Sequence, residues 1–144
     1  MRIPREVLDM LAAQPLFSGL SKNELRSVAS LGTPVEFKSG RVITEEGTIG
    51  REAILIVSGS ARCLVAGKKV AELGPGDLFG EISLLDQAPR SASVIADTDM
   101  EATVFLAPEF LKLVQTSPKI ALKLLTALAA RLRATDRKFT VGHG

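Results

Sequence analysis

The chain has 144 residues, of which 46% are hydrophobic, and this is enough apolar material for one domain with a buried core. The same apolar content excludes a disordered chain, and the net charge of +2 is too small to indicate nucleic-acid binding through bulk electrostatics. No apolar run has the length of a membrane span, and the N-terminus lacks the apolar core of a signal peptide. We therefore expect a single cytoplasmic domain over residues 1–144 that does not contact a membrane.

Two short helices are predicted at the N-terminal end of the chain. Residues 5–14 carry apolar side chains at helical spacing, and Pro15 ends that helix because it has no backbone N–H to donate. Ser21 and Glu24 then form an S-x-x-E capping box, which is typical of the start of a helix. Gly32 is expected to close this second helix.

From about residue 34 to residue 106 the pattern changes to that of short strands. Residues 53–57 form a continuous apolar run of strand length, and neighbouring runs are separated by glycine-rich turns. Many short strands with such turns predict a mainly β domain, built as a double-sheet roll or barrel. Cys63 is the only cysteine, so it forms no internal disulfide, and its apolar neighbours predict a buried, inert thiol.

Two helices are predicted at the C-terminal end, over about residues 107–138. Pro108 starts the first, and Ser117 and Pro118 separate it from a second, longer helix. Along the longer helix, residues at alternating steps of four and three form a heptad seam: Ala121, Leu125, Leu128, Leu132, Thr135 and Phe139. This seam predicts a homodimer along the helix. The alternative is a helix that packs on its own β-roll.

The residues with the clearest binding chemistry lie between positions 80 and 94. Glu81 offers a carboxylate that can accept hydrogen bonds from a sugar diol, and Arg90 offers a planar, permanently charged fork for a phosphate. Backbone N–H groups near Gly80, at the start of a short turn, also favour an anion. One ligand that holds a ribose and a phosphate close together would satisfy all of these groups. The simpler alternatives are a surface ion pair for Arg90 and a stabilising position near a helix N-terminus for Glu81.

This stretch resembles the phosphate-binding cassette of cyclic-nucleotide-binding domains. The residues that carry the resemblance are Phe79 to Leu85 followed by Pro89 to Val94. Such domains occur in the bacterial catabolite activator family, in kinase regulatory subunits and in cyclic-nucleotide-gated channels. The resemblance implies an eight-stranded β-roll, a form of jelly roll, flanked by N-terminal helices and two C-terminal helices.

The same resemblance implies a role for each cassette residue. Glu81 would hold the ribose 2′-hydroxyl, and Arg90 with Ser91 would hold the cyclic phosphate. Backbone amides near Gly80 and Ile82 would complete the site. A small residue at the position of Ser91 accompanies cAMP in this family and a threonine accompanies cGMP, so we expect cAMP as the ligand, with cGMP as the alternative.

Residues 130–138 also resemble the part of the activator's dimer helix that reaches adenine. That resemblance implies that Thr135 contacts the adenine amino group. Asp136 stands where the family has a serine contributed by the partner subunit. An ionised aspartate accepts hydrogen bonds and an adenine amino group donates them, so Asp136 can keep this contact. The simpler interpretation of Thr135 is a polar residue that tunes helix pairing.

The predicted function is that of a cAMP sensor which acts through its C-terminal helix on an unidentified effector protein. No catalytic motif is present and the only histidine is His143, so we expect no enzyme activity. Only residues 139–144 follow the predicted long helix, which is too short for a helix-turn-helix module, so this chain alone is not expected to bind DNA. The alternatives are a regulatory fragment of a larger transcription factor, channel or enzyme, and a relic of the fold that no longer binds nucleotide.

Overall fold

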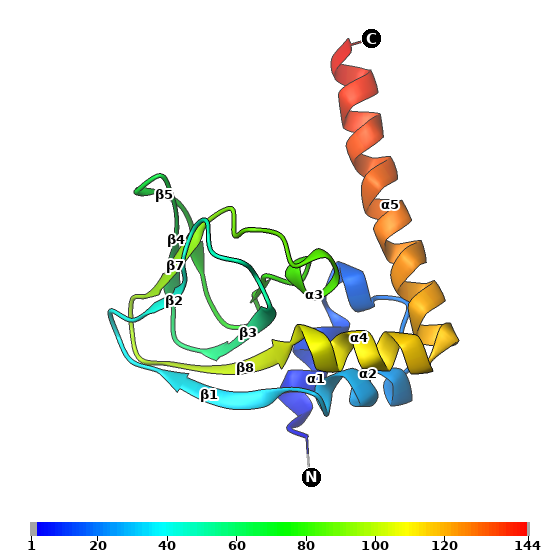
Figure 1. The fold of residues 1–144 in the computed structure, drawn as a ribbon, viewed down its shortest axis with the longest axis horizontal. Helices are drawn as coiled ribbons and strands as arrows, with labels where there is room; N and C mark the ends of the chain where they lie inside the picture. Colours follow the sequence, from blue (N-terminus) through cyan, green and yellow to red (C-terminus); the bar gives the residue numbers. More distant parts are fainter. Residues whose placement is uncertain (1–2, 144) are drawn as a thin grey trace.

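The computed structural model describes residues 3–143, with side chains described as far as residue 136. Two antiparallel sheets of four strands face each other, ordered β1-β8-β3-β6 and β2-β7-β4-β5. Helices precede and follow this roll in the chain (Figure 1). The predicted mainly β fold, with eight strands flanked by helices, is confirmed.

The strands are short, as the turns between them predict. Their bounds are β1 Thr33–Phe37, β2 Val42–Thr44, β3 Glu52–Ser58, β4 Ala61–Val65, β5 Lys68–Leu73, β6 Leu78–Phe79, β7 Ser93–Ala96 and β8 Met100–Leu106. Ala66 and Gly67 form the turn between β4 and β5, and both have a positive φ, 51° and 78°. The two-residue strand β6 has too few residues to produce a recognisable pattern in the sequence.

Strand β3 is buried on both faces, which explains its continuous apolar run. Ile54 and Ile56 are 0% exposed and pack inside the roll. Leu55 is also 0% exposed, but it packs on the outer face of the sheet with residues of the helices. The core therefore has two layers, one between the sheets and one between the first sheet and the helices that cover it.

The N-terminal helices begin and end close to the predicted positions. Helix α1 spans Arg5–Ala12, and a short 3-10 helix, η1 (Pro15–Phe17), follows it. Helix α1 is two residues shorter than expected, because the chain leaves the helix before Pro15. Helix α2 (Lys22–Ala29) has the predicted capping box: the Glu24 amide donates to the Ser21 hydroxyl, and the Ser21 amide donates to the Glu24 carboxylate.

The two C-terminal helices follow β8 and pack in the outer layer of the core. Helix α4 spans Ala107–Thr116, and α5 spans Pro118–His143, beyond the predicted end near residue 138. The chain offers no proline between Pro118 and its end to stop the longer helix. Figure 1 shows the C-terminal half of α5 extending away from the rest of the domain. No helix among residues 3–143 is both long enough and apolar enough to cross a bilayer.

The predicted heptad seam does not coincide with one face of α5. Ile120 and Leu124 are 3% exposed and pack in the outer core, and Leu128 packs partly against the same cluster. Leu125 and Leu132 are each 64% exposed. The predicted seam therefore combines residues of two faces: Leu128 belongs to the face that contacts the domain, while Leu125 and Leu132 belong to the exposed face. The side chain of Phe139 lies outside the described residues.

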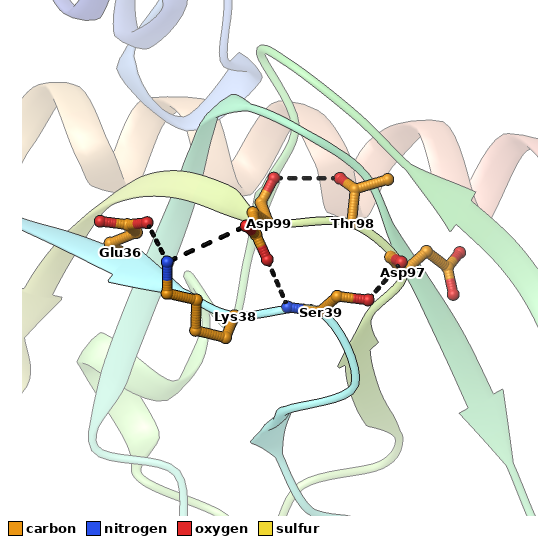
Figure 2. Close-up of polar contacts among 6 residues, drawn as sticks. All are labelled: Glu36, Lys38, Ser39, Asp97, Thr98 and Asp99. Carbon is orange, nitrogen blue, oxygen red and sulfur yellow. Dashed lines mark hydrogen bonds and ion pairs between the residues drawn. The ribbon is translucent and has the colours of Figure 1, made fainter.

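The turn after β1 is tied to the turn between β7 and β8. The Ser39 amide donates to the Asp99 carboxylate at 2.9 Å, and the Ser39 hydroxyl donates to the Asp97 carbonyl at 2.8 Å (Figure 2). Lys38 lies beside Glu36 and Asp99 at the same place. Asp97 and Asp99 thus hold these two turns together.

Candidate functional site

The cassette begins at a glycine that the structure requires. Strand β6 leads into Gly80, which has a φ of 78°, a value that favours glycine. A Cβ atom at this position would lie 2.4 Å from Nη1 of Arg90 and 2.8 Å from the carbonyl oxygen of Glu52. Both the backbone conformation and the space beside it therefore exclude a side chain at residue 80. The short helix α3 (Ser83–Asp86) follows and ends at Gln87, which is left-handed with a φ of 50°.

Arg90 is held in place by groups from three parts of the chain. Its Nη2 donates to the carbonyl of Glu52 at 2.9 Å, and its Nη1 donates to the hydroxyl of Ser83 at 3.3 Å. Its backbone amide donates to the carbonyl of Thr48 at 2.7 Å. Burial lowers the pKa of the Arg90 guanidinium, and the Glu52 carboxylate opposes that shift. An arginine stays charged at any physiological pH, so the site contains one fixed, partly desolvated cation.

Gly50 leaves the space that the Arg90 and Ser83 side chains occupy, and the sequence gives little indication of this role. A Cβ atom there would lie 2.3 Å from Oγ of Ser83 and 3.1 Å from Nε of Arg90. Ser83 is expected from the sequence to be only a turn residue, but its hydroxyl also accepts from Arg90. Gly50 and Glu52 lie far from Arg90 in the chain, and only the folded structure brings them beside it, whereas Ser83 lies seven residues before Arg90 in the same cassette.

A cavity of about 350 Å³ opens beside Arg90. Four residues predicted to bind the ligand line it, namely Gly80, Ile82, Arg90 and Ser91. Part of its wall is apolar and includes Cys63, Leu73, Phe79 and Val94. A volume of this order and a mostly apolar wall with a few polar groups are typical of small-molecule sites.

The cavity also has hydrogen-bond donors for an anion. Among the described residues, the backbone amides of Ile82 and Ser91 have no backbone or side-chain acceptor. With the Ser91 hydroxyl and the Arg90 guanidinium, the lining residues therefore offer several donors and one positive charge. This combination suits a phosphate, because charge-assisted hydrogen bonds are stronger than neutral ones.

Cys63 differs from its predicted surroundings. It is partly buried, and it lines the cavity. Burial raises the pKa of its thiol, so the thiol remains protonated at neutral pH and is a weak nucleophile. The predicted lack of reactivity therefore has a physical cause, although the residue is not fully buried.

Glu81 faces helix α5 and is not among the residues that line the cavity. Its Oε1 lies 3.8 Å from Nη1 of Arg131, and its side chain is 23% exposed. Helix α3 starts only at Ser83, so Glu81 precedes that helix instead of lying in its first turn. The Glu81–Arg131 ion pair links the cassette to α5. Sequence reasoning missed Arg131, and the available signal was its position four residues before Thr135, on the same face of the helix.

Thr135 and Asp136 lie apart from the cavity. Both side chains are exposed, and the Thr135 hydroxyl donates to the carbonyl of Arg131 at 3.1 Å. The structure therefore brings Gly80, Ile82, Arg90 and Ser91 together in one cavity wall, whereas Thr135 and Asp136 belong to α5 and do not line this cavity.

The β-roll thus holds an anchored, partly desolvated guanidinium beside a small cavity. The family profile of the cyclic nucleotide-binding domain matches residues 34–117, from β1 to the end of α4. The chain belongs to this family.

Known proteins with similar sequences include regulators and kinase subunits. The cyclic AMP receptor protein of Thermus thermophilus is 36% identical over 131 residues, which cover 88% of this chain and 61% of that protein. The cAMP-dependent protein kinase regulatory subunit of Schizosaccharomyces pombe is 32% identical over 105 residues, covering 72% of this chain and 26% of that protein. The chain thus spans about three fifths of the Thermus protein and a smaller part of the kinase subunit.

Solved structures agree with this assignment. The N-terminal domain of a transcriptional regulator from Streptomyces coelicolor superimposes with a TM-score of 0.83 at 28% identity, covering 90% of this chain and 96% of that one. The catabolite activator protein of Thermus thermophilus gives a TM-score of 0.69 at 35% identity, covering 89% of this chain and 62% of that one.

Proposed function

We propose that the chain binds cAMP in the cavity beside Arg90 and acts as a regulatory domain. The observation that carries this proposal is the anchoring of the Arg90 guanidinium by the Glu52 carbonyl and the Ser83 hydroxyl. A guanidinium fixed before the ligand arrives loses little side-chain entropy on binding, so more of its attraction for a phosphate appears as affinity. Arg90 and Ser91 hold the cyclic phosphate, and the amides near Gly80 and Ile82 complete its contacts.

The ribose and the base have separate partners in this proposal. Glu81 accepts from the ribose 2′-hydroxyl, next to Arg131. Thr135 lies one helical turn beyond Arg131 on the same face, where it reaches the adenine amino group once α5 approaches the cavity, and Asp136 follows as a second acceptor. Ser91 in place of threonine and the name of the Thermus relative favour cAMP over cGMP.

The signal leaves the domain through α5. The Glu81–Arg131 ion pair is a direct contact between the cassette and this helix. A ligand hydroxyl that binds Glu81 competes with Arg131 for the carboxylate and so alters the contact that holds α5 against the cassette. The chain forms one regulatory domain over residues 1–144 in the cytoplasm, it has no catalytic activity or membrane contact, and it acts on an effector protein. It performs this role as a separate protein or as a regulatory part of a larger one.

A calorimetric titration with cAMP and with cGMP tests this function. We expect tighter binding of cAMP, and Arg90→Ala should weaken it by roughly tenfold to a hundredfold, because a hydrogen bond to a charged group contributes about 1.5–3 kcal/mol. Arg41→Ala is the matched control, since Arg41 is exposed and does not line the cavity. If the folded wild-type protein produces no heat with either nucleotide, the fold is a relic and the proposal is wrong.

A further inference from the structure

A second cavity, of about 470 Å³, lies on the outer face of the first sheet. It is bounded by the start of α1, by the segment between α2 and β1, and by parts of β1, β3 and β8. Much of its wall is apolar, including Ile3, Val7, Ala29, Pro34 and Val57. It shares no lining residue with the cavity beside Arg90, so it is a separate site.

A largely buried threonine lies in the wall of this second cavity. Thr103 is only 6% exposed, and its hydroxyl has no hydrogen-bond partner among the described residues. Within the same part of the chain, no fully buried side-chain oxygen or nitrogen lacks a partner. The Thr103 hydroxyl is therefore not completely buried, and Thr103 is one of the residues that line the cavity. Its methyl group faces Gly32, where an added Cβ atom would lie 2.3 Å away.

Three carboxylates surround the apolar wall. They belong to Glu6 in the first turn of α1, Glu36 in β1 and Glu101 in β8. Glu36 and Glu101 are direct cross-strand partners in the antiparallel register, and like charges at such positions repel each other.

Only one of these carboxylates has a cation beside it in the described structure. Glu36 pairs with Lys38 at 2.9 Å, and Figure 2 shows that the same ammonium also faces Asp99, at 3.9 Å. Among the described residues, no lysine or arginine nitrogen lies within 4.0 Å of a carboxylate oxygen of Glu6 or Glu101. The cavity therefore has an apolar wall and an excess of negative charge.

We propose that this second cavity binds a small organic cation with an apolar body and one ammonium or amidinium group. The apolar body removes the wall from water, the cation lies between Glu36 and Glu101, and the Thr103 hydroxyl accepts one of its N–H groups. No set of three metal-binding side chains is present within the described residues, which disfavours a bare metal ion. A nucleotide phosphate is repelled by the three carboxylates. This inference does not depend on nucleotide binding at Arg90.

The test uses 4-phenylbutylamine and its uncharged analogue 4-phenylbutanol as probes, each titrated against the full chain and followed by amide NMR shifts. We expect saturable shifts at Val7, Glu36 and Thr103, with the amine bound about tenfold more tightly than the alcohol, because only the amine gains charge-assisted hydrogen bonds. Equal affinity for the two probes, saturable shifts confined to other residues, or no saturable binding of the amine would overturn the proposal.

Four variants test whether the amine binds at this cavity. Glu101→Gln should weaken amine binding by about fivefold or more and leave the alcohol unaffected, whereas Glu109→Gln, an exposed acid on α4 outside the cavity, should change neither. Arg90→Ala should leave the amine affinity unchanged. An unchanged amine affinity in Glu101→Gln overturns the proposal. Because Arg2 precedes Ile3 in the chain, Arg2→Ala is titrated as well, and amine binding that appears only in this variant also overturns it.

Discussion

Gly80 and Gly67 share a backbone conformation but not their surroundings. Both have a φ of 78°, and a Cβ atom at Gly67 would meet nothing within 4 Å, whereas one at Gly80 would meet Nη1 of Arg90 at 2.4 Å. We predict that Gly67→Ala lowers the free energy of unfolding by about 1 kcal/mol or somewhat more, because alanine is strained at this φ, and that Gly80→Ala lowers it further, because its Cβ also meets the Glu52 carbonyl oxygen. Only Gly80→Ala should also weaken cAMP binding, by about tenfold or more, since it displaces the guanidinium.

Urea unfolding measures the stability of these two glycine variants, and calorimetry measures their affinity for cAMP. Gly67→Ala serves as the control for backbone strain. Unchanged cAMP affinity in a folded Gly80→Ala protein would show that the position of the Arg90 side chain does not govern binding.

At the scale of single residues, the sequence predicts the cassette but not the residues that hold Arg90 in position. Arg90 and Ser91 follow each other in a recognisable motif, and the structure has both in one cavity wall. Glu52 contacts Arg90 through its backbone carbonyl, which every residue type has. Gly50 matters because it lacks a side chain that would collide with Ser83 and Arg90. Neither contribution can be predicted from residue type alone. Arg131 was missed because its partner Glu81 is fifty positions away.

At the scale of elements, α2 and α5 are joined by an ion pair between Glu24 and Lys123. The hydrogen bond from Lys123 lowers the pKa of the Glu24 carboxyl, and the bond from the Ser21 amide in the capping box lowers it further. A carboxyl with a lowered folded-state pKa stabilises the fold above its ordinary value of 4.5, and this contribution is lost as the pH falls through the folded-state pKa.

We predict that Lys123→Met lowers the free energy of unfolding at pH 7 and that its difference from the wild type shrinks at a second, acidic pH below the lowered folded-state pKa of Glu24, where this carboxyl is protonated in both proteins. Urea unfolding at the two pH values measures this. Lys119→Met, which removes an exposed lysine of the same helix, is the control. A difference of the same size at both pH values would mean that the ion pair does not account for the effect.

Element types and starts could be predicted where the chain gives local signals. Ser21 and Glu24 mark the start of α2 and form the capping box that their spacing predicts. The assignment of faces on α5 could not be predicted in the same way. Leu125 and Leu128 are both apolar at heptad spacing, and only the position of the domain beneath the helix decides that Leu128 packs on it while Leu125 is exposed.

At the scale of the whole molecule, the exposed face of α5 is a candidate dimer surface that keeps Leu125 and Leu132 of the predicted seam. Leu122, Leu125 and Leu132 are 65%, 64% and 64% exposed, and such a stripe of leucines on one helix is typical of a surface that pairs. We predict a homodimer in sedimentation at about 100 μM protein, a concentration far above the dissociation constant of a stable pair. Leu125→Glu should convert it to a monomer, because it places a charge in the interface without touching the core.

Val70→Glu is the control for this change, since Val70 is 60% exposed on β5 and lies outside the helix. Leu128 is a poor choice for the same test, because its side chain packs against the domain and its replacement would also destabilise the fold. A wild-type protein that sediments as a monomer would contradict the dimer.

The most direct test of nucleotide binding in this fold is a crystal structure of the chain grown with saturating cAMP. We predict density for the nucleotide in the cavity beside Arg90, with phosphate oxygens within hydrogen-bond distance of the Arg90 guanidinium and the Ser91 hydroxyl, and with the ribose next to Glu81. Nucleotide density at another place in the molecule, or an empty cavity in well-ordered crystals grown under these conditions, would contradict the assignment.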